Sequence, residues 1–295
     1  MERLNLAIIG VGLIGGSFGL ALKSRLGDAV QIRGLCRTQA SMDAAVARGA
    51  VDEASPDIAE VVRDADVIYL STPVLQIVPM VKKLLPFVKE GTVLTDAGST
   101  KSYLWNEIRP LLPEHVYYVS GHPMTGREKS GVAAADKDLF VNKCYVLLRE
   151  TTAPKEVLDK LADLIRLTGA NLPTLDMAQH DRCASIISHV PHVAAAALVT
   201  LLERSEDDRA ACLALAGGGF KDTTRIASSN ADMWADICMT NGPAIEKHLG
   251  ELQKILGDVI DAIHRKDREA VHDYFAAAKT RRDLILHETE PLFEI

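Results

Sequence analysis

Hydrophobic residues near the start of the chain form one short uninterrupted run, residues 6–9, and glycine-rich sequence follows it directly. A run of this length without polar positions is typical of a β-strand that is buried on both faces. The next stretch, residues 18–26, is predicted to be a helix. The chain therefore opens with a strand, a tight glycine turn and a helix.

The same alternation continues through the first half of the chain. Further buried-type strands are predicted at residues 30–35, 67–70, 92–94, 116–119 and 143–148, and helices at residues 41–48 and 154–167. Strands that alternate with helices predict a doubly wound parallel α/β sheet. Ligands of such sheets bind beyond the carboxyl ends of the strands, so the residues that follow each strand are the candidate site.

The strand pattern disappears after residue 176. Helices are predicted at residues 177–203, 220–228, 243–264 and 266–287, with Pro191 kinking the first of them. Apolar residues spaced three and four apart form a seam on the third helix: Ile245, Leu249, Leu252, Leu256, Val259 and Ile263. We therefore expect two domains, residues 1–173 and an all-helical domain of residues 174–295. The seam packs either on a second copy or within the subunit.

Composition narrows the class of protein. The net charge of −7 argues against a nucleic-acid partner. We expect no membrane span, because no apolar run in the sequence looks long enough, and no leader, because a strand begins almost at once. The five cysteines are scattered and odd in number, which is typical of free thiols in a reducing, cytoplasmic setting.

The glycine turn has the spacing G-x-G-x-x-G between a strand and a helix. Gly10 allows the turn, Gly12 lets the backbone approach a pyrophosphate, and Gly15 lets the helix pack closely on the strand. The helix N-terminus then offers N–H groups to the phosphates. The segment predicts a Rossmann-type dinucleotide site, with contacts from Gly10, Gly12, Leu13, Ile14 and Gly15.

Residues after the second and third strands extend this site. Where an NAD site has a carboxylate for the ribose, this chain has Cys36, followed by Arg37 and Thr38. An arginine beside a hydroxyl suits a 2′-phosphate, so the pattern favours NADP over NAD, unless Arg37 is only a solvated loop charge. The residues that break the third strand are predicted to line the same crevice: Ser71, Thr72 and Pro73.

A candidate general base follows the fifth strand. A dehydrogenase needs a group that accepts a hydroxyl proton, and His122 has the right pKa class and lies at a strand end. Ser99 follows the fourth strand and is expected in the same crevice. The alternative for His122 is a hydrogen-bonded loop histidine without a role in chemistry.

The helical half contains further candidates. His189 and His192 share one helical face, and we expect them to contact an anionic substrate or the nicotinamide rather than, with His180, a metal ion. One of the pair could be structural. Arg225 could grip a carboxylate with its planar guanidinium or could be a surface arginine, and Trp234 could wall a ring pocket or belong to the core.

These residues match a family. The chain resembles prephenate dehydrogenases of the prephenate and arogenate dehydrogenase group over nearly its whole length. The resemblance rests on five segments in the family's order: GVGLIGGS at 10–17, DAGSTK at 96–101, GHPMTGREKSG at 121–131, SHVPH at 188–192 and GGFKDTTRIA at 218–227. The last three together are specific to this group.

The resemblance implies NAD(P)-dependent oxidative decarboxylation of prephenate to 4-hydroxyphenylpyruvate in tyrosine biosynthesis. By this resemblance His122 accepts the ring hydroxyl proton, Ser99 orients His122 and approaches the nicotinamide, and Arg225 grips a substrate carboxylate. It also implies that the helical domain binds substrate and forms a homodimer. The alternative substrate is arogenate, whose amino group an acidic residue could favour.

The remaining site residues also follow from the resemblance. It assigns His192, with Ser188 and His189, to the second-domain wall of the substrate site. Glu128 and Trp234 match residues at the edge of the pocket. Asp181 and Glu128 are the acidic residues that the sequence offers for an arogenate amino group, and the sequence does not place them.

Overall fold

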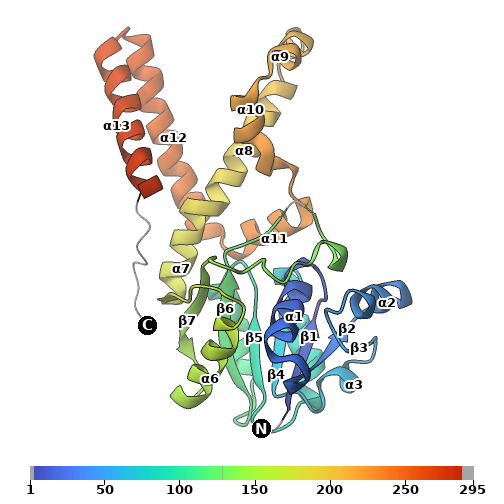
Figure 1. Cartoon of the computed structure of the whole chain (residues 1–295). Helices are drawn as coiled ribbons and strands as arrows, with labels where there is room; N and C mark the ends of the chain where they lie inside the picture. Colours follow the sequence, from blue (N-terminus) through green and yellow to red (C-terminus); the bar gives the residue numbers. More distant parts are fainter. Residues whose placement is uncertain (1–2, 128, 288–295) are drawn as a thin grey trace.

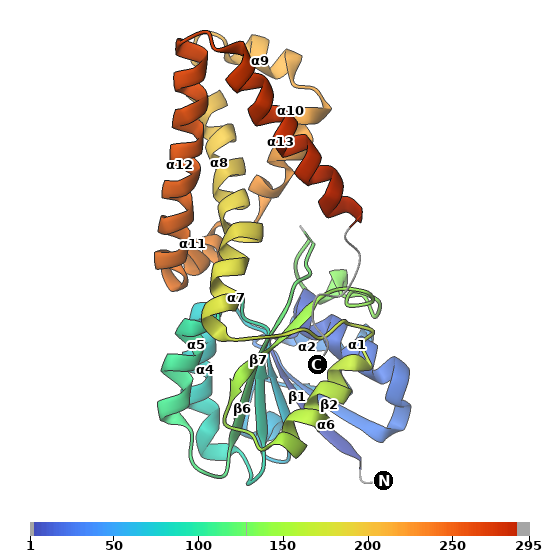
Figure 2. The same ribbon diagram turned by 90° about the vertical axis from the view of Figure 1, so that its left-hand side faces the viewer.

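The computed structural model describes residues 3–127 and 129–287. An α/β domain forms the lower half of the molecule, and long helices rise from one edge of its sheet (Figure 1). Figure 2 shows the same helices from the side, with α7 and α8 continuing upward from the sheet. The predicted fold class, a Rossmann-type sheet followed by a helical domain, is confirmed.

The sheet has eight strands in the order β3-β2-β1-β4-β5-β6-β7-β8. Their bounds are β1 (Leu4–Ile9), β2 (Val30–Leu35), β3 (Glu53–Ser55), β4 (Val67–Leu70), β5 (Val93–Asp96), β6 (Tyr117–Pro123), β7 (Tyr145–Thr151) and β8 (Thr174–Leu175). Strands β1, β4, β5 and β6 are neighbours and run parallel. Their carboxyl ends therefore meet at one edge, which faces the helical domain (Figure 1).

The sheet differs from the prediction at both sides. Two short strands, β3 and β8, were not predicted, because two or three residues give no periodic signal. The sheet is also not wholly parallel, since β7 pairs antiparallel with β6. No α-helix crosses over between these two strands among the described residues, and a parallel pair needs such a crossover. The last strand lies just beyond the predicted domain limit at residue 173.

Helices cover both faces of the sheet. One face packs on α1 (Leu13–Leu26), α2 (Gln39–Ala47) and α6 (Lys155–Arg166). The other packs on α3 (Ile58–Val62), α4 (Val74–Leu84) and α5 (Ser102–Ile108). The buried apolar side chains of this domain form two clusters, one in each of these layers, which fixes the position of the strand ends.

The second half of the described chain is helical. A continuous rod consists of α7 (Met177–Ala184), a π-helical segment (Ser185–His189) and α8 (Val190–Glu203). The remaining helices are α9 (Arg209–Leu215), α10 (Gly218–Thr224), α11 (Ala231–Thr240), α12 (Gly242–His264) and α13 (Arg268–His287). In place of the kink predicted at Pro191, the rod has a π-helical turn just before it, and Pro191 lies in the first turn of α8.

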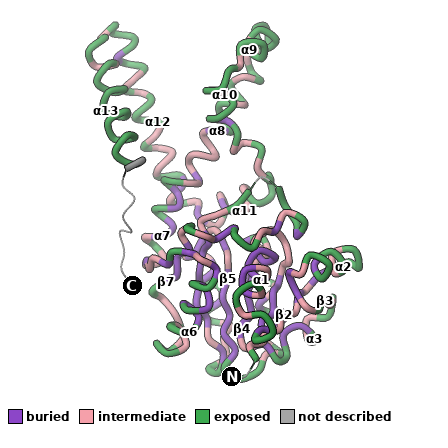
Figure 3. Tube along the Cα trace, viewed as in Figure 1, coloured by how far each residue is buried: buried purple, intermediate pink, exposed green. Residues whose placement is uncertain are grey.

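The helical domain is poorly buried in a single chain (Figure 3). Helices α8 to α10 form one arm and α12 with α13 forms another, and the arms diverge away from the sheet (Figure 1). The expectation that no membrane-length apolar helix exists was wrong. The rod Met177–Glu203 is long and apolar enough to cross a bilayer by length and composition, with a mean hydropathy of 1.7 over its most apolar window.

Side-chain hydrogen bonds join the two domains at the sheet edge. Thr100 Oγ1 lies 2.9 Å from Thr240 Oγ1 at the end of α11. Asp181 on α7 accepts hydrogen bonds from the backbone N–H groups of Lys101 and Ser102, each at 2.8 Å. Asp181 thereby caps the N-terminus of α5 from another domain. The base of α7 is thus fixed against the strand ends.

Candidate active site

The predicted crevice lies where β1, β4, β5 and β6 end. Ladder register aligns Ile9 with Leu70, Leu70 with Asp96, and Asp96 with Ser120. The glycine turn, the segment after β4, the segment after β5 and the candidate base at the end of β6 therefore meet along one edge of the sheet. The sequence prediction that the sheet gathers these segments is consistent with this geometry.

The glycine turn has the shape that a dinucleotide pyrophosphate requires. Gly10 has φ +97°, and a Cβ there would lie 2.9 Å from the backbone of Ser71. A Cβ on Gly15 would lie 2.4 Å from the Gly10 carbonyl oxygen, so α1 packs directly on the turn. A Cβ on Gly12, in contrast, would meet nothing within 4 Å. The open space beside Gly12, at the start of α1, fits a phosphate group.

Residues after β4 line the same turn. Ser71 donates a hydrogen bond of 2.8 Å from Oγ to the Gly10 carbonyl oxygen. Thr72 packs beside Gly10, and its buried Oγ1 has no hydrogen-bond partner among the described residues. Pro73 immediately precedes α4. A buried hydroxyl without a partner next to an open cradle is the kind of atom that a bound ligand satisfies.

The end of β2 presents one cation. Cys36 is buried and its thiol is hydrogen-bonded to Ser41, and burial raises its pKa. Arg37 is exposed. The Thr38 side chain accepts a hydrogen bond from the Ser41 backbone N–H and caps α2. Arg37 and Thr38 were predicted to bind a 2′-phosphate. Arg37 therefore points to solvent, whereas the side chain of Thr38 already caps α2.

The candidate base is buried at the domain interface. His122 ends β6 and is 9% exposed, and its Nδ1 lies 2.8 Å from Nε2 of His180 on α7. Burial lowers the pKa of His122 well below its usual range, and the neighbouring His180, Lys101 and His189 lower it further. His122 is therefore neutral at neutral pH and can accept a proton.

A buried ion pair holds the backbone just before this histidine. Lys101 is fully buried, pairs with Asp96, and donates a hydrogen bond of 2.6 Å to the carbonyl oxygen of Gly121. The other oxygen of Asp96 accepts from Tyr118 and Ser120, each at 2.7 Å. Every oxygen of the buried carboxylate thus has a donor, as a buried charge requires.

The π-helical segment positions two further imidazoles. Asn241 donates from Nδ2 to Nδ1 of His189 at 3.1 Å, and burial lowers the pKa of His189 to about 4. The ring of His192 stacks on Trp234 with centroids 3.7 Å apart, and its Nδ1 donates to the Ser188 carbonyl at 2.9 Å. His189 therefore carries its proton on Nε2 and acts as a donor there, while neutral His192 has an acceptor at Nε2.

Arg225 belongs to the same side of the molecule. Burial lowers the pKa of His192, and the nearby charge of Arg225 lowers it further. His189 in turn lies close enough to His122 to influence its pKa. The four residues are therefore linked pairwise: His189 influences the pKa of His122, Trp234 lies against both His189 and His192, and Arg225 influences the pKa of His192.

The other predicted residues are placed less completely. Ser99 is half-buried in the segment after β5. The hydrogen bond that the structure gives to His122 goes to His180, so the orienting role predicted for Ser99 stays a prediction. Trp234 lies between His189 and His192, and its buried Nε1 has no hydrogen-bond partner among the described residues. Glu128 lies outside the described residues.

Three contributors were missed from the sequence. His180 was considered only as a metal ligand, and among the described residues no group of three or more ligand side chains could hold a metal ion. Asn241 and Lys101 were given no role. The signal for Lys101 was a lysine in the loop after β5, in the segment DAGSTK. Nothing local marks Asn241, whose partners lie about sixty residues away.

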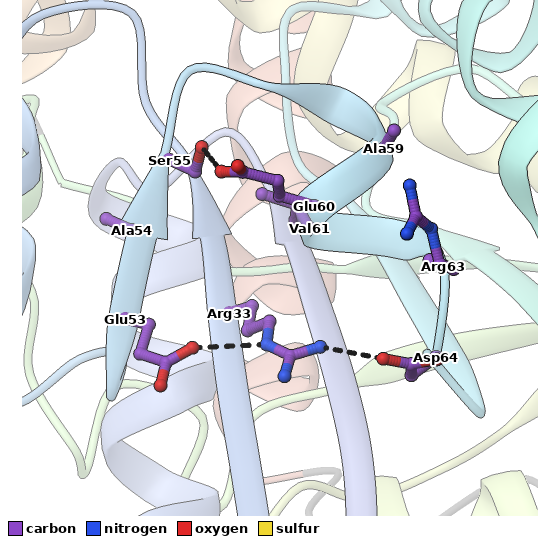
Figure 4. Close-up of a pocket in the computed structure, with 9 residues that line it drawn as sticks. All are labelled: Arg33, Glu53, Ala54, Ser55, Ala59, Glu60, Val61, Arg63 and Asp64. Carbon is purple, nitrogen blue, oxygen red and sulfur yellow. Dashed lines mark hydrogen bonds and ion pairs between the residues drawn. The ribbon is translucent and has the colours of Figure 1, made fainter.

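A separate cavity of about 340 Å³ lies beside β2, β3 and α3 (Figure 4). Arg33 occupies its middle, with Nε 3.2 Å from Glu53 and Nη1 3.4 Å from Asp64. None of the predicted site residues lines it. The cavity is therefore distinct from the strand ends where the predicted site residues lie.

A dinucleotide cradle beside a buried neutral histidine, with a second domain supplying imidazoles and a guanidinium, defines a two-domain dinucleotide-dependent oxidoreductase. Residues 18–174 match the family model described as the prephenate dehydrogenase nucleotide-binding domain, and residues 176–277 match the prephenate dehydrogenase dimerization domain. The chain belongs to the prephenate dehydrogenase family.

Individual relatives agree with this assignment. A prephenate dehydrogenase of Bacillus subtilis is 34% identical, with 94% of this chain and 74% of the relative covered. The crystal structure of prephenate dehydrogenase from A. aeolicus in complex with hydroxyphenyl propionate and NAD+ has a TM-score of 0.87 and 31% identity, covering 97% of this chain and 99% of that one. Synechocystis arogenate dehydrogenase has a TM-score of 0.81 and 29% identity, covering 96% of this chain and all of that one.

Proposed function

We propose that this protein catalyses the NAD(P)-dependent oxidative decarboxylation of prephenate to 4-hydroxyphenylpyruvate. The observation that carries the proposal is the buried, neutral His122 at the strand ends, beside the dinucleotide cradle, with His189 near enough to influence its pKa. Family membership and the 34% identity to the B. subtilis prephenate dehydrogenase support the same substrate.

The residues suit each demand of this reaction. His122 is neutral, so it can take the proton of the ring hydroxyl as the carbon bearing it is oxidised. A bound nicotinamide dinucleotide supplies the hydride acceptor. Arg225 offers a bidentate partner for a substrate carboxylate, and His189 offers an N–H donor on the same wall. Loss of carbon dioxide then leaves an aromatic ring, which makes the step effectively irreversible.

Prephenate is favoured over arogenate by the position of Asp181. Arogenate carries an amino group that needs an acidic partner. Asp181 Oδ1 accepts from Lys101 N–H and from His180, and Oδ2 accepts from Ser102 N–H. Both oxygens are thus engaged inside the domain interface and do not serve a substrate amine. The match to Synechocystis arogenate dehydrogenase keeps arogenate as the alternative substrate.

For the dinucleotide, we propose that NADP is preferred. Exposed Arg37 lies two residues after the end of β2, where a 2′-phosphate would lie, and Cys36 stands where a carboxylate would hold a free ribose hydroxyl. The A. aeolicus relative was crystallised with NAD+, so NAD is the alternative.

The chain is further proposed to work as a homodimer through its helical domain. The predicted seam on α12 is partly uncovered in the single chain, with Leu256 50% exposed and Ile263 60% exposed, whereas Ile245 at its start is buried. The family model for residues 176–277 is described as a dimerization domain. A second copy that covers α8 and α12 would bury apolar surface that the subunit leaves open.

Steady-state kinetics on two acids and two dinucleotides tests these proposals together. Purified protein is mixed with prephenate or arogenate and with NADP or NAD, and formation of the reduced dinucleotide is followed. We expect the highest kcat/KM for prephenate with NADP. Higher kcat/KM for arogenate would overturn the substrate, and higher kcat/KM with NAD would overturn the cofactor preference.

A substitution tests the proposed base. His122→Asn should abolish turnover and leave dinucleotide affinity within about threefold, because the cradle is built from β1, α1 and β4 rather than from β6. Turnover at the wild-type rate in this variant would remove His122 from the mechanism. The matched control is His115→Asn, which changes a histidine before β6 at the opposite edge of the sheet.

A further inference from the structure

Three buried side chains form a line across the domain interface. His122 Nδ1 lies 2.8 Å from His180 Nε2, and His180 Nδ1 lies 2.9 Å from Asp181 Oδ1. His122 ends β6, whereas the other two residues lie in the first turns of α7. All three are less than 10% exposed, so water does not compete for these hydrogen bonds.

The carboxylate end of the line sets the direction of the hydrogen bonds. Asp181 accepts from the backbone N–H groups of Lys101 and Ser102, which can only donate. Burial raises the pKa of Asp181, but the hydrogen bonds from His180, Ser102 and Lys101 outweigh it and lower that pKa overall. Asp181 is therefore an ionised acceptor, and Nδ1 of His180 carries a proton.

The protonation of His180 in turn determines which nitrogen of His122 carries a proton. Burial lowers the pKa of His180, so its ring is neutral and Nε2 is an acceptor. Nδ1 of His122 must then carry the proton of the bond between the two rings. Neutral His122 has one proton, so its lone pair lies on Nε2.

We propose that His180, oriented by Asp181, is a positioning residue that holds His122 in the tautomer with its lone pair on Nε2. The proposal rests on the proposed function, in which His122 is the base. The substrate O–H bond breaks, its electron pair stays with oxygen, and the proton forms a new bond to Nε2. The resulting imidazolium donates from Nδ1 to neutral His180, and the charge of Asp181 stabilises the cation.

Other charged groups around His122 do not supply this function. Lys101 repels the imidazolium, and the charge of Lys101 is balanced by its ion pair with Asp96. His189 is neutral and is held by Asn241. Asp181 is linked to His122 by the ring of His180, which is hydrogen-bonded to both residues. The tautomer of His122 therefore depends on His180.

The tautomer can be measured without any turnover. Protein labelled with ¹⁵N in histidine is examined by NMR at neutral pH, with the His122 signals assigned by their loss in His122→Asn. We expect Nδ1 of His122 to be protonated and Nε2 to have the chemical shift of a nitrogen with a free lone pair. A proton on Nε2 instead would overturn the proposal.

Kinetics of two variants completes the test. His180→Leu removes the acceptor and should lower kcat by about 10³-fold with KM for the acid within about threefold, by analogy with loss of a base-orienting group. His180→Gln keeps an oxygen that can accept from His122 and should recover part of this loss. Wild-type kcat in His180→Leu would overturn the proposal.

A matched control separates positioning from packing. His248→Leu removes another histidine that bonds to the same rod, at Ser185 Oγ 2.9 Å away, without touching the line. We expect near wild-type kcat in His248→Leu, and thermal stability in this variant that is similar to that of the His180 variants. Equal losses of kcat in both would assign His180 a packing role. If the wild type oxidises neither acid, the proposed function fails, and the NMR result still decides the tautomer.

Discussion

Three glycines at the turn after β1 show how differently neighbouring residues of one motif are constrained. Gly15 is enclosed by the Gly10 carbonyl, Ser71 Oγ and the side chain of Ile8. Each of these would lie within 2.8 Å of a Cβ at residue 15. Gly12 faces open space. The surroundings agree with the roles that the motif predicts, in which Gly15 serves the packing of the helix and Gly12 the approach of the ligand.

Gly12→Ala and Gly15→Ala should therefore fail in different ways. Gly12→Ala should fold as the wild type does and lose dinucleotide affinity by tenfold or more, because its methyl group enters the proposed phosphate space. Gly15→Ala should unfold at a lower denaturant concentration, because its methyl group overlaps the backbone. Fluorescence titration and urea unfolding measure the two effects. Wild-type affinity in Gly12→Ala would contradict the assignment of that space.

Lys101→Met should destabilise the α/β domain strongly. The substitution leaves the buried carboxylate of Asp96 without its cation and the Gly121 carbonyl without its donor. Loss of one partner from a buried pair typically costs about 3–5 kcal/mol of unfolding free energy. Urea unfolding measures this, with Lys155→Met as a control because its pair with Asp159 is exposed and should matter little. Equal effects in the two variants would contradict the role of the buried pair.

A site residue could be predicted from the sequence when the strand that contains or precedes it fixes its position. His122, Ser71 and the glycines follow from the rule that strand ends share one edge. The partner of His122 could not be predicted in this way, because His180 lies 58 residues further on in another domain. Sequence reasoning therefore identified the proposed base but not the histidine that contacts it.

Among the elements, the rod from α7 to α8 was predicted in length but not in its inner geometry. The π-helical segment holds Ser188 and His189 and lies directly before Pro191. Proline lacks the N–H that a regular helix would use, and a local change of hydrogen-bond register is a common way to accommodate it. The insertion turns the two imidazoles of this rod toward Asn241 and Trp234 rather than bending the helix sharply.

The apolar character of this rod also has a simple explanation at the scale of elements. By composition it could cross a bilayer, and little of its most apolar window is buried in the single chain. Its first turns, however, hold His180 and Asp181, which are hydrogen-bonded to His122, Lys101 and Ser102 of the α/β domain. An apolar rod that is anchored at one end in a polar interface fits a subunit contact, as proposed for α12.

Leu256→Glu on α12 should convert the proposed dimer to monomers of about 32.0 kDa. A charge at a position that is 50% exposed in the subunit is tolerated by the fold but not by an apolar contact between copies. Light scattering after size exclusion measures the mass. Lys254→Glu, at an exposed position two residues away and so on roughly the opposite face of α12, is the control and should stay dimeric. A dimeric Leu256→Glu would place the interface elsewhere.

At the scale of the whole molecule, the two domains meet through buried neutral histidines. Burial lowers the pKa values of His122, His180 and His189, the last to about 4. In the unfolded chain these groups take up protons below about pH 6.5. The unfolded state therefore binds more protons as pH falls from about 6.5 to 4, and stability declines over that range.

Acidification from pH 7.5 to 5 should accordingly lower the free energy of unfolding. His189 alone accounts for about 2 kcal/mol, from the difference between about 4 and its usual value. Carboxylates with lowered pKa values, such as Asp181, lose their contribution only at lower pH. Urea midpoints at the two pH values measure the decline, and His189→Gln should reduce it. Equal midpoints in the wild type would contradict the buried neutral state.

The sequence by itself determined the strand-turn-helix cradle, the alternation that builds the sheet, the helical second half and the position of His122 at the end of β6. Each of these follows from local periodicity or from glycine stereochemistry within a few residues. Only the tertiary structure decided the reversed strand β7, the π-helical segment, the capping of α5 by Asp181 and the contact of His180 with His122. These features depend on which segments, far apart in the sequence, meet at the sheet edge. A hydrogen bond between domains produces no periodic pattern in the sequence of either segment, so sequence periodicity does not reveal it.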